Sequence, residues 1–181
     1  MTVRALESDA PLIVYVDIKS PYALAAIEPT LKLERELGMQ FDWRPLTLDI
    51  PSYLGSARKK AGKVVESNRS PAQWAGIKYA YKDARRYAER QGHILNGTEN
   101  IWDSSLINIA ILWVVEHQRE RLADFFAAVY PPFWRRELDI EDVSVIAALL
   151  TEAGADAAGF AAYAAADGRA AHDRVRADAE E

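Results

Sequence analysis

The first apolar run of the chain, residues 12–16, limits the possible fold more than any other segment. Its sequence is Leu-Ile-Val-Tyr-Val, and Pro11 and Asp17 close it on either side. A short β-branched and aromatic run of this kind is typical of a parallel strand buried on both faces. It is too short for a membrane span or for the hydrophobic region of a signal peptide. We therefore expect an α/β fold and a cytoplasmic protein that does not enter membranes.

A helix and a second strand follow this run. Ser20 and Pro21 stand in the order typical of a helix N-cap and its first position, and Gly38 occupies a place suited to a left-handed C-terminal residue. Apolar and polar residues then alternate over 41–45. The pattern predicts a strand, a helix ending near Leu37 that Pro29 should kink, and a second strand, joined as a right-handed β-α-β crossover.

The next segment, 49–68, shows no steady period, and we interpret it as a long loop. Its basic cluster at 58–63 is most simply solvated, and the alternative is that it contacts an anionic ligand. Ser70 and Pro71 repeat the helix-start signal, and Gly92 ends the pattern. The apolar residues of this helix recur at helical spacing on one face, which we expect to be buried. They are Trp74, Ile77, Tyr81, Ala84 and Ala88.

The second half of the sequence is predicted to be helical. Residues 106–117 are apolar on nearly every side, which is typical of a central helix, and a further helix from Leu122 should break at Pro131 and Pro132. Three more helices are expected at 142–150, 157–166 and 169–179. No convincing strand follows Pro45, and two parallel strands leave most of a sheet edge unpaired. We therefore expect the sheet to be incomplete in this sequence.

Composition excludes several classes of function. The net charge of −5 and the pI near 5.3 argue against binding to nucleic acid. The absence of cysteine excludes disulfide scaffolds, thiolate metal sites and a disulfide oxidoreductase that uses its own sulfur. The three histidines do not stand at metal-ligand or catalytic spacing, so we predict no metal site and structural or surface roles for all three.

One turn is a candidate for chemistry. Asp17-Ile-Lys-Ser20-Pro21-Tyr22 lies where the first strand ends and the helix begins. Ligands of α/β sheets bind at the carboxyl ends of strands, and a helix N-terminus stabilises an anion there. On local sequence alone, Ser20 is interpreted as a simple N-cap, as most serines at helix starts are.

This strand-turn-helix motif resembles the glutathione-dependent branch of the DsbA-like thioredoxin superfamily, namely 2-hydroxychromene-2-carboxylate isomerases and kappa-class glutathione transferases. The segment from Asn68 to Pro71 is similar to the Asn-Pro loop of that branch, and Trp102 and the Asp139-Ile140-x-Asp142 run stand in family-like order. The resemblance covers roughly residues 12–171.

The resemblance implies a thioredoxin-like fold with a large helical insertion. Residues 1–48 would form the N-terminal β-α-β half, 49–168 the insertion, and 169–181 the start of the return to the thioredoxin-like domain. Members of the branch continue with a Val-Pro segment, two more strands and a final helix. The C-terminal part of the sheet is therefore expected to be absent from this sequence.

The resemblance also implies a function. Ser20 would be the catalytic residue, donating a hydrogen bond that stabilises the thiolate of glutathione, the expected cofactor. Glutathione would also contact Pro21, Tyr22 and Asn68. The expected activity is isomerisation or glutathione transfer on small aromatic or electrophilic compounds, by a homodimer.

Trp74, Tyr81 and Trp102 would line the substrate pocket, although aromatic residues at such spacing also serve as core. Asn68 could equally shape the loop before Ser70. The alternative function is a catalytically silent thioredoxin-like protein that binds another protein or a ligand other than glutathione.

Overall fold

The computed structural model describes residues 7–179. Its first elements are β1 (Ile13–Val16), α1 (Pro21–Leu37) and β2 (Asp42–Pro45). β1 and β2 pair in parallel, with Ile13 opposite Asp42 and Val16 opposite Pro45. Pro21 opens α1, Pro29 lies inside it, and Gly38 ends it with a left-handed φ of 61°. The predicted strand-helix-strand order is confirmed.

β2, not β1, is the inner strand of this pair. Trp43 is 1% exposed and its ring lies 5.2 Å from that of Phe126. In β1, only Val16 is buried, while Ile13 and Tyr15 are 38% and 40% exposed. The prediction of a first strand buried on both faces is wrong, because Ile13 and Tyr15 stay more than one third exposed even though the Tyr15 hydroxyl donates to Asp178 of α8 (Asp167–Ala179).

The segment predicted to be a long loop is structured. It contains α2 (Ile50–Leu54) and an antiparallel hairpin of β3 (Ala57–Lys60) and β4 (Lys63–Ser67). Ala61 and Gly62 connect the strands with φ angles of 49° and 76°, the left-handed pair that a tight two-residue hairpin turn needs. The sequence did not reveal this hairpin because all of β4 is exposed and no apolar residues alternate with polar ones.

α3 (Pro71–Arg90) starts as predicted, and Ser70 and Gln73 cap it reciprocally. The predicted face points inward, but it is buried only in its second half. Ala84 and Ala88 are buried, whereas Trp74, Ile77 and Tyr81 are half-buried. The expectation of full burial is wrong for these three residues because they line a cleft.

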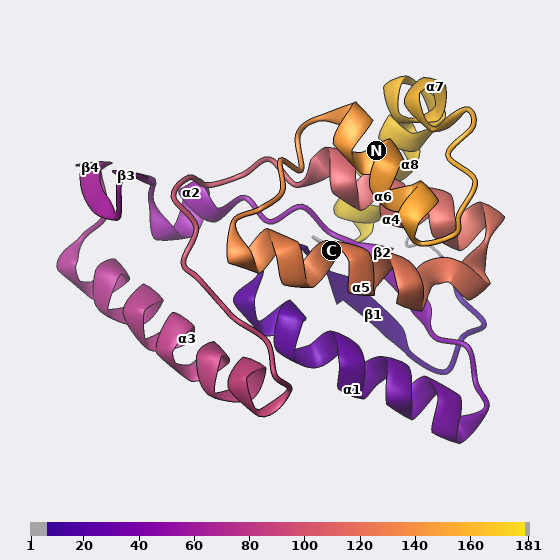
Figure 1. Cartoon of the computed structure of the whole chain (residues 1–181), viewed down its shortest axis with the longest axis horizontal. Helices are drawn as coiled ribbons and strands as arrows, with labels where there is room; N and C mark the ends of the chain where they lie inside the picture. The colour runs from indigo at the N-terminus through magenta and orange to yellow at the C-terminus, as the bar shows by residue number, and fades with distance from the viewer. Residues whose placement is uncertain (1–6, 180–181) are drawn as a thin grey trace.

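The helical half of the protein surrounds α4 (Ser105–His117). α4 is buried on most sides and packs against β2, α5 and the three C-terminal helices. Figure 1 shows α1 below the two strands in that view and α4 and α8 above them. The helices that follow α4 are a short 3-10 helix (Arg119–Arg121), α5 (Leu122–Arg135), α6 (Val143–Glu152), α7 (Phe160–Ala165) and α8 (Asp167–Ala179).

α5 does not break at its proline pair. Pro131 and Pro132 lie inside the helix, which ends at Arg135, followed by Arg136 with a left-handed φ of 69°. The predicted break is wrong because Phe133 and Trp134, which follow the prolines, are buried in the core. Burial of two large aromatic side chains offsets the lost backbone hydrogen bonds.

Candidate functional site

A cleft of about 930 Å³ lies beside the N-terminus of α1. Its walls come from the α1 end, from α2 and the β3–β4 hairpin, from the inner face of α3, and from residues 97–102. Six of the seven residues predicted for the site line it. They are Ser20, Pro21, Tyr22, Trp74, Tyr81 and Trp102.

Ser20 occupies the N-cap position of α1, with extended backbone angles, but its side chain makes no capping hydrogen bond. Its backbone N–H donates to the Asp17 carbonyl, which fixes the turn. The hydroxyl is therefore available to the cleft and is not used to cap the helix. The first turn of α1 carries no acidic residue, so the positive end of the helix dipole is not neutralised there.

Tyr22 joins the two helices that flank the cleft. Its hydroxyl donates to Asp83 Oδ2 of α3 at 3.1 Å. Burial and the neighbouring Asp83 carboxylate raise the pKa of this hydroxyl, so it stays protonated as a donor. Tyr22 thus fixes the position of the α1 N-terminus relative to α3.

Asn68 lies outside the cleft lining. Its Oδ1 accepts a hydrogen bond from the Ser56 N–H at 2.7 Å, and its own N–H donates to the Ser56 carbonyl. These bonds close the open end of the hairpin. The next residue, Arg69, does line the cleft, and its guanidinium lies 5.1 Å from the Trp74 ring centroid. A direct contact between Asn68 and glutathione stays a prediction.

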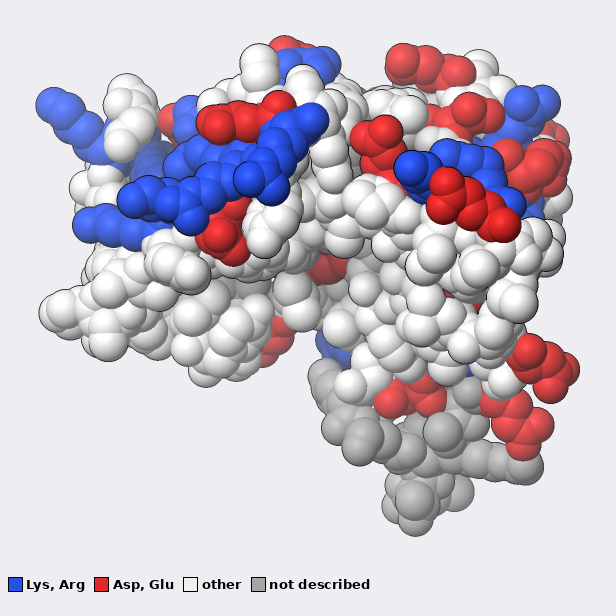
Figure 2. Space-filling view, turned by 90° about the horizontal axis from the view of Figure 1, so that it is seen from below, with Lys and Arg blue, Asp and Glu red and all other residues white. Residues whose placement is uncertain are grey.

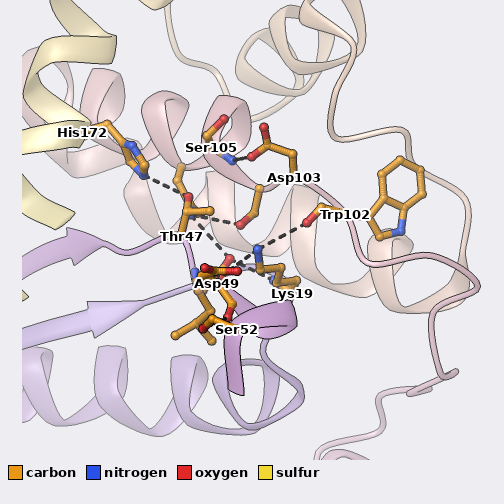
Figure 3. A network of polar contacts seen from close by, with 12 residues as sticks. Lys19, Thr47, Asp49, Ser52, Trp102, Asp103, Ser105 and His172 are labelled. Atoms are coloured by element: carbon orange, nitrogen blue, oxygen red, sulfur yellow. Dashed lines mark hydrogen bonds and ion pairs between the residues drawn. The ribbon is translucent and has the colours of Figure 1, made fainter. Parts of the chain in front are cut away.

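The turn before α1 buries an ion pair, in which Lys19 Nζ lies 3.8 Å from Asp17 Oδ2. Lys19 Nζ also donates a hydrogen bond to the Trp102 carbonyl at 3.3 Å (Figure 3). The Asp17 carboxylate also accepts from the Leu48 N–H at 2.8 Å and from Asn108 Nδ2 at 3.5 Å. Burial raises the pKa of Asp17, and the Lys19 charge opposes that shift.

The same polar network reaches α8. Asn108 Nδ2 donates to Thr47 Oγ1 at 2.9 Å, and Thr47 Oγ1 lies 3.0 Å from Nε2 of His172. Burial lowers the pKa of His172, which favours the neutral imidazole. Its Nε2 can then accept a hydrogen bond from the Thr47 hydroxyl. His172 is thus a buried structural residue, in agreement with its predicted structural role.

Sequence reasoning missed the cationic character of the cleft. Among the described residues that line it, six carry a positive side chain and one, Glu99, a negative side chain. Figure 2 shows Lys and Arg gathered on the side of the molecule where Figure 1 places α3 and the hairpin. The six are Lys19, Lys59, Arg69, Lys78, Lys82 and Arg85.

The sequence held only part of this signal. Lys59 belongs to the basic cluster interpreted as a solvated loop, and within that cluster Lys60 and Lys63 do lie outside the cleft lining. In α3, Lys78, Lys82 and Arg85 stand at helical spacing on one side of the helix. A positive stripe next to an aromatic one could have suggested a cleft wall.

Within residues 7–179, no group of three or more potential ligand side chains is placed to hold a metal ion. Within the same range, every helix is too short or too polar to cross a bilayer.

Comparisons with known proteins bear on the fold. The solved structure of a 2-hydroxychromene-2-carboxylate isomerase is similar at a TM-score of 0.64 and 18% identity, over 91% of this chain and 76% of that one. A putative protein disulfide isomerase from Nitrosomonas europaea matches at a TM-score of 0.61 and 12% identity, over 91% of this chain and 76% of that one. A probable DsbA oxidoreductase from Streptomyces coelicolor matches at a TM-score of 0.60 and 21% identity, over 92% of this chain and 71% of that one.

At these identities the likeness shows the fold: a thioredoxin-like fold of the DsbA type with a helical insertion and a small sheet. No protein among the curated sequences matches this chain. The family model for the DSBA-like thioredoxin domain matches residues 11–181, which is nearly the whole sequence. The chain therefore belongs to the DSBA-like thioredoxin domain family.

Proposed function

We propose that this protein is a glutathione-dependent isomerase or transferase that acts on small aromatic or electrophilic compounds. The observation that carries the proposal is the Ser20 hydroxyl, which lines a large cleft at a helix N-terminus and is not used as a cap. Because the chain has no cysteine, a thiol for this position must come from a ligand. The structural similarity to a 2-hydroxychromene-2-carboxylate isomerase supports this choice.

The dimensions and charge of the cleft fit glutathione. Pockets for small molecules span about 300–1,000 Å³, and this cleft lies within that range at about 930 Å³. Glutathione carries two carboxylates, and the cleft lining is rich in lysine and arginine. Bound there, glutathione would supply a thiolate nucleophile. Pro21 and Tyr22 would form the wall beside it.

Two features of the chain favour an anionic sulfur at this position. The N-terminus of α1 presents the positive end of its dipole. The Ser20 hydroxyl can donate a charge-assisted hydrogen bond. Lys19 lines the same wall, but its charge is already paired with the buried Asp17 carboxylate. The two features lower the pKa of a protein cysteine and would act in the same way on a ligand thiol.

The aromatic side chains form the apolar part of the cleft. Trp74 and Tyr81 line it from α3, and Trp102 lines it from the segment before α4. They provide flat surfaces against which an aromatic acceptor can pack. We assign the acceptor to this wall and propose that the active form is a homodimer.

The test is a calorimetric titration of the protein with reduced glutathione and, separately, with S-methylglutathione. The thiolate absorbance of the bound ligand, followed against pH, gives the pKa of its thiol. Ser20→Ala should raise this pKa by an amount that corresponds to the free energy of one charge-assisted hydrogen bond, about 1.5–3 kcal/mol. The same variant should leave S-methylglutathione binding unchanged, because that ligand has no thiolate. No interaction at millimolar glutathione would overturn the proposal and favour a catalytically silent binding protein.

A further inference from the structure

The segment between α3 and α4 is fixed at four points on the far wall of the cleft. The bonds come from α3, from the C-terminal end of α5 and from the hairpin, so the segment is held in place before any ligand binds. Arg85 Nε donates to the Leu95 carbonyl at 2.9 Å, and the Asn96 N–H donates to the Trp134 carbonyl at 3.0 Å. The Arg136 side chain donates to the Gly97 carbonyl, and the Lys59 N–H donates to the Glu99 carbonyl at 2.9 Å.

Two positive side chains converge on Gly97 of this segment. A Cβ atom built on Gly97 would lie 3.7 Å from Lys59 Nζ and 3.9 Å from an Nη atom of Arg85. The Tyr81 ring stands 3.8 Å from the same point. Arg85 is held there, because its Nε is bonded to Leu95 and its guanidinium lies 5.7 Å from the Tyr81 ring centroid. The missing side chain of Gly97 leaves room between the two charges.

The chain does not neutralise these charges. Within the described residues, no carboxylate lies at ion-pair distance from Lys59 or Arg85. Glu99, the acidic residue of the lining, instead pairs with Arg136 at 3.7 Å and accepts from the Gly62 N–H. Like charges that converge at a half-buried point repel each other, which costs free energy unless an anion binds between them.

We propose that Lys59 and Arg85, around Gly97, form an oxyanion subsite for the dianionic phosphate group of a ligand whose apolar part lies along Tyr81 and Trp102. A dianion balances both charges, whereas a carboxylate balances one. Arg85 presents a planar fork suited to phosphate, and Lys59 adds a point charge. The inference rests on the proposed function in one respect: it places the phosphate-bearing ligand in the same cleft as glutathione.

The test compares three probes with the same ring system: 1-naphthyl phosphate, 1-naphthoate and 1-naphthalenemethanol. Calorimetry on the full chain gives the dissociation constant of each. We expect the phosphate to bind about tenfold more tightly than the carboxylate, and the neutral alcohol to bind weakest. Equal or tighter binding of naphthoate would overturn the assignment to a phosphate dianion.

Variants locate the binding. Lys59→Met and Arg85→Gln should each weaken naphthyl phosphate binding about tenfold or more, and Gly97→Ala should weaken it by filling the space between the charges. Lys60→Met is the matched control, since Lys60 belongs to the same strand and lies outside the cleft lining. If Lys60→Met weakens binding as much as Lys59→Met does, the subsite is wrong.

Arg85→Gln also removes the bond to Leu95, so its thermal unfolding is measured alongside. Lys59→Met, on the hairpin, keeps the proposal testable should Arg85→Gln fail to fold. Ser20→Ala separates the two proposals, because it should leave naphthyl phosphate binding unchanged. If naphthyl phosphate binds and glutathione does not, the proposed function alone is refuted. If glutathione binds but neither Lys59→Met nor Arg85→Gln weakens naphthyl phosphate binding, the subsite alone is refuted.

Discussion

Lys19 Nζ lies 3.8 Å from Asp17 Oδ2, and the two side chains are only 6% and 2% exposed. The pair stands directly before Ser20, and Lys19 also bonds the Trp102 carbonyl. It therefore connects the end of β1 to the segment that leads into α4. A buried pair in this position holds the floor of the cleft in place.

Breaking this pair should destabilise the fold. Lys19→Met leaves the Asp17 carboxylate buried without its cation, and we expect a loss of about 3–5 kcal/mol in the free energy of unfolding. Urea denaturation measures it. The matched control is Lys32→Met, whose partner Glu36 lies 3.6 Å away on an exposed helix face and should contribute less than about 1 kcal/mol. Equal effects of the two variants would show that the Lys19 pair is not effectively buried.

His172 should make stability depend on pH near neutrality. Burial lowers its pKa below 6.5, so between the folded pKa and 6.5 the unfolded chain binds a proton that the folded chain does not. Its contribution is present above pH 6.5 and is lost as pH falls through the folded pKa. Denaturation of wild type and His172→Gln at several pH values should show a flatter profile for the variant. His93→Gln serves as control, and an unchanged slope in His172→Gln would contradict the prediction.

Two serines at helix starts should differ in their effect on stability. Ser70 caps α3 through the Gln73 N–H at 3.2 Å, whereas the Ser20 hydroxyl makes no capping bond on α1. Ser70→Ala should therefore cost about 1 kcal/mol, and Ser20→Ala less than about 0.5 kcal/mol. Thermal or urea unfolding of both variants decides this. A loss of 1 kcal/mol or so in Ser20→Ala would mean that Ser20 is a cap in solution.

The inner face of α3 can be tested at Ala84, which is fully buried. Ala84→Leu should overpack the contact with the core and destabilise the protein by about 1–3 kcal/mol. Ala75→Leu on the same helix is exposed and should change the free energy of unfolding by less than about 0.5 kcal/mol. If Ala84→Leu proves neutral, α3 is rotated relative to the arrangement described.

The sequence by itself determined the β-α-β unit and the place of Ser20. The signals for these features are local: Ser20-Pro21 starts a helix, Gly38 ends it, and a strand follows within a few residues. The same local signals predicted the start of α3 at Ser70. Each depends on backbone preferences that a residue carries into any fold.

Only the tertiary structure decided how the site is assembled. Lys59 on an exposed hairpin, Arg85 on α3 and Gly97 in a connecting segment are distant in sequence and share no periodic pattern, yet they meet at one point. The burial of Lys19 and the continuation of α5 through Pro131 likewise depend on neighbours supplied by other elements. Periodicity records which face of an element is apolar; it does not record which other element comes to lie against that face, and that contact creates the cleft.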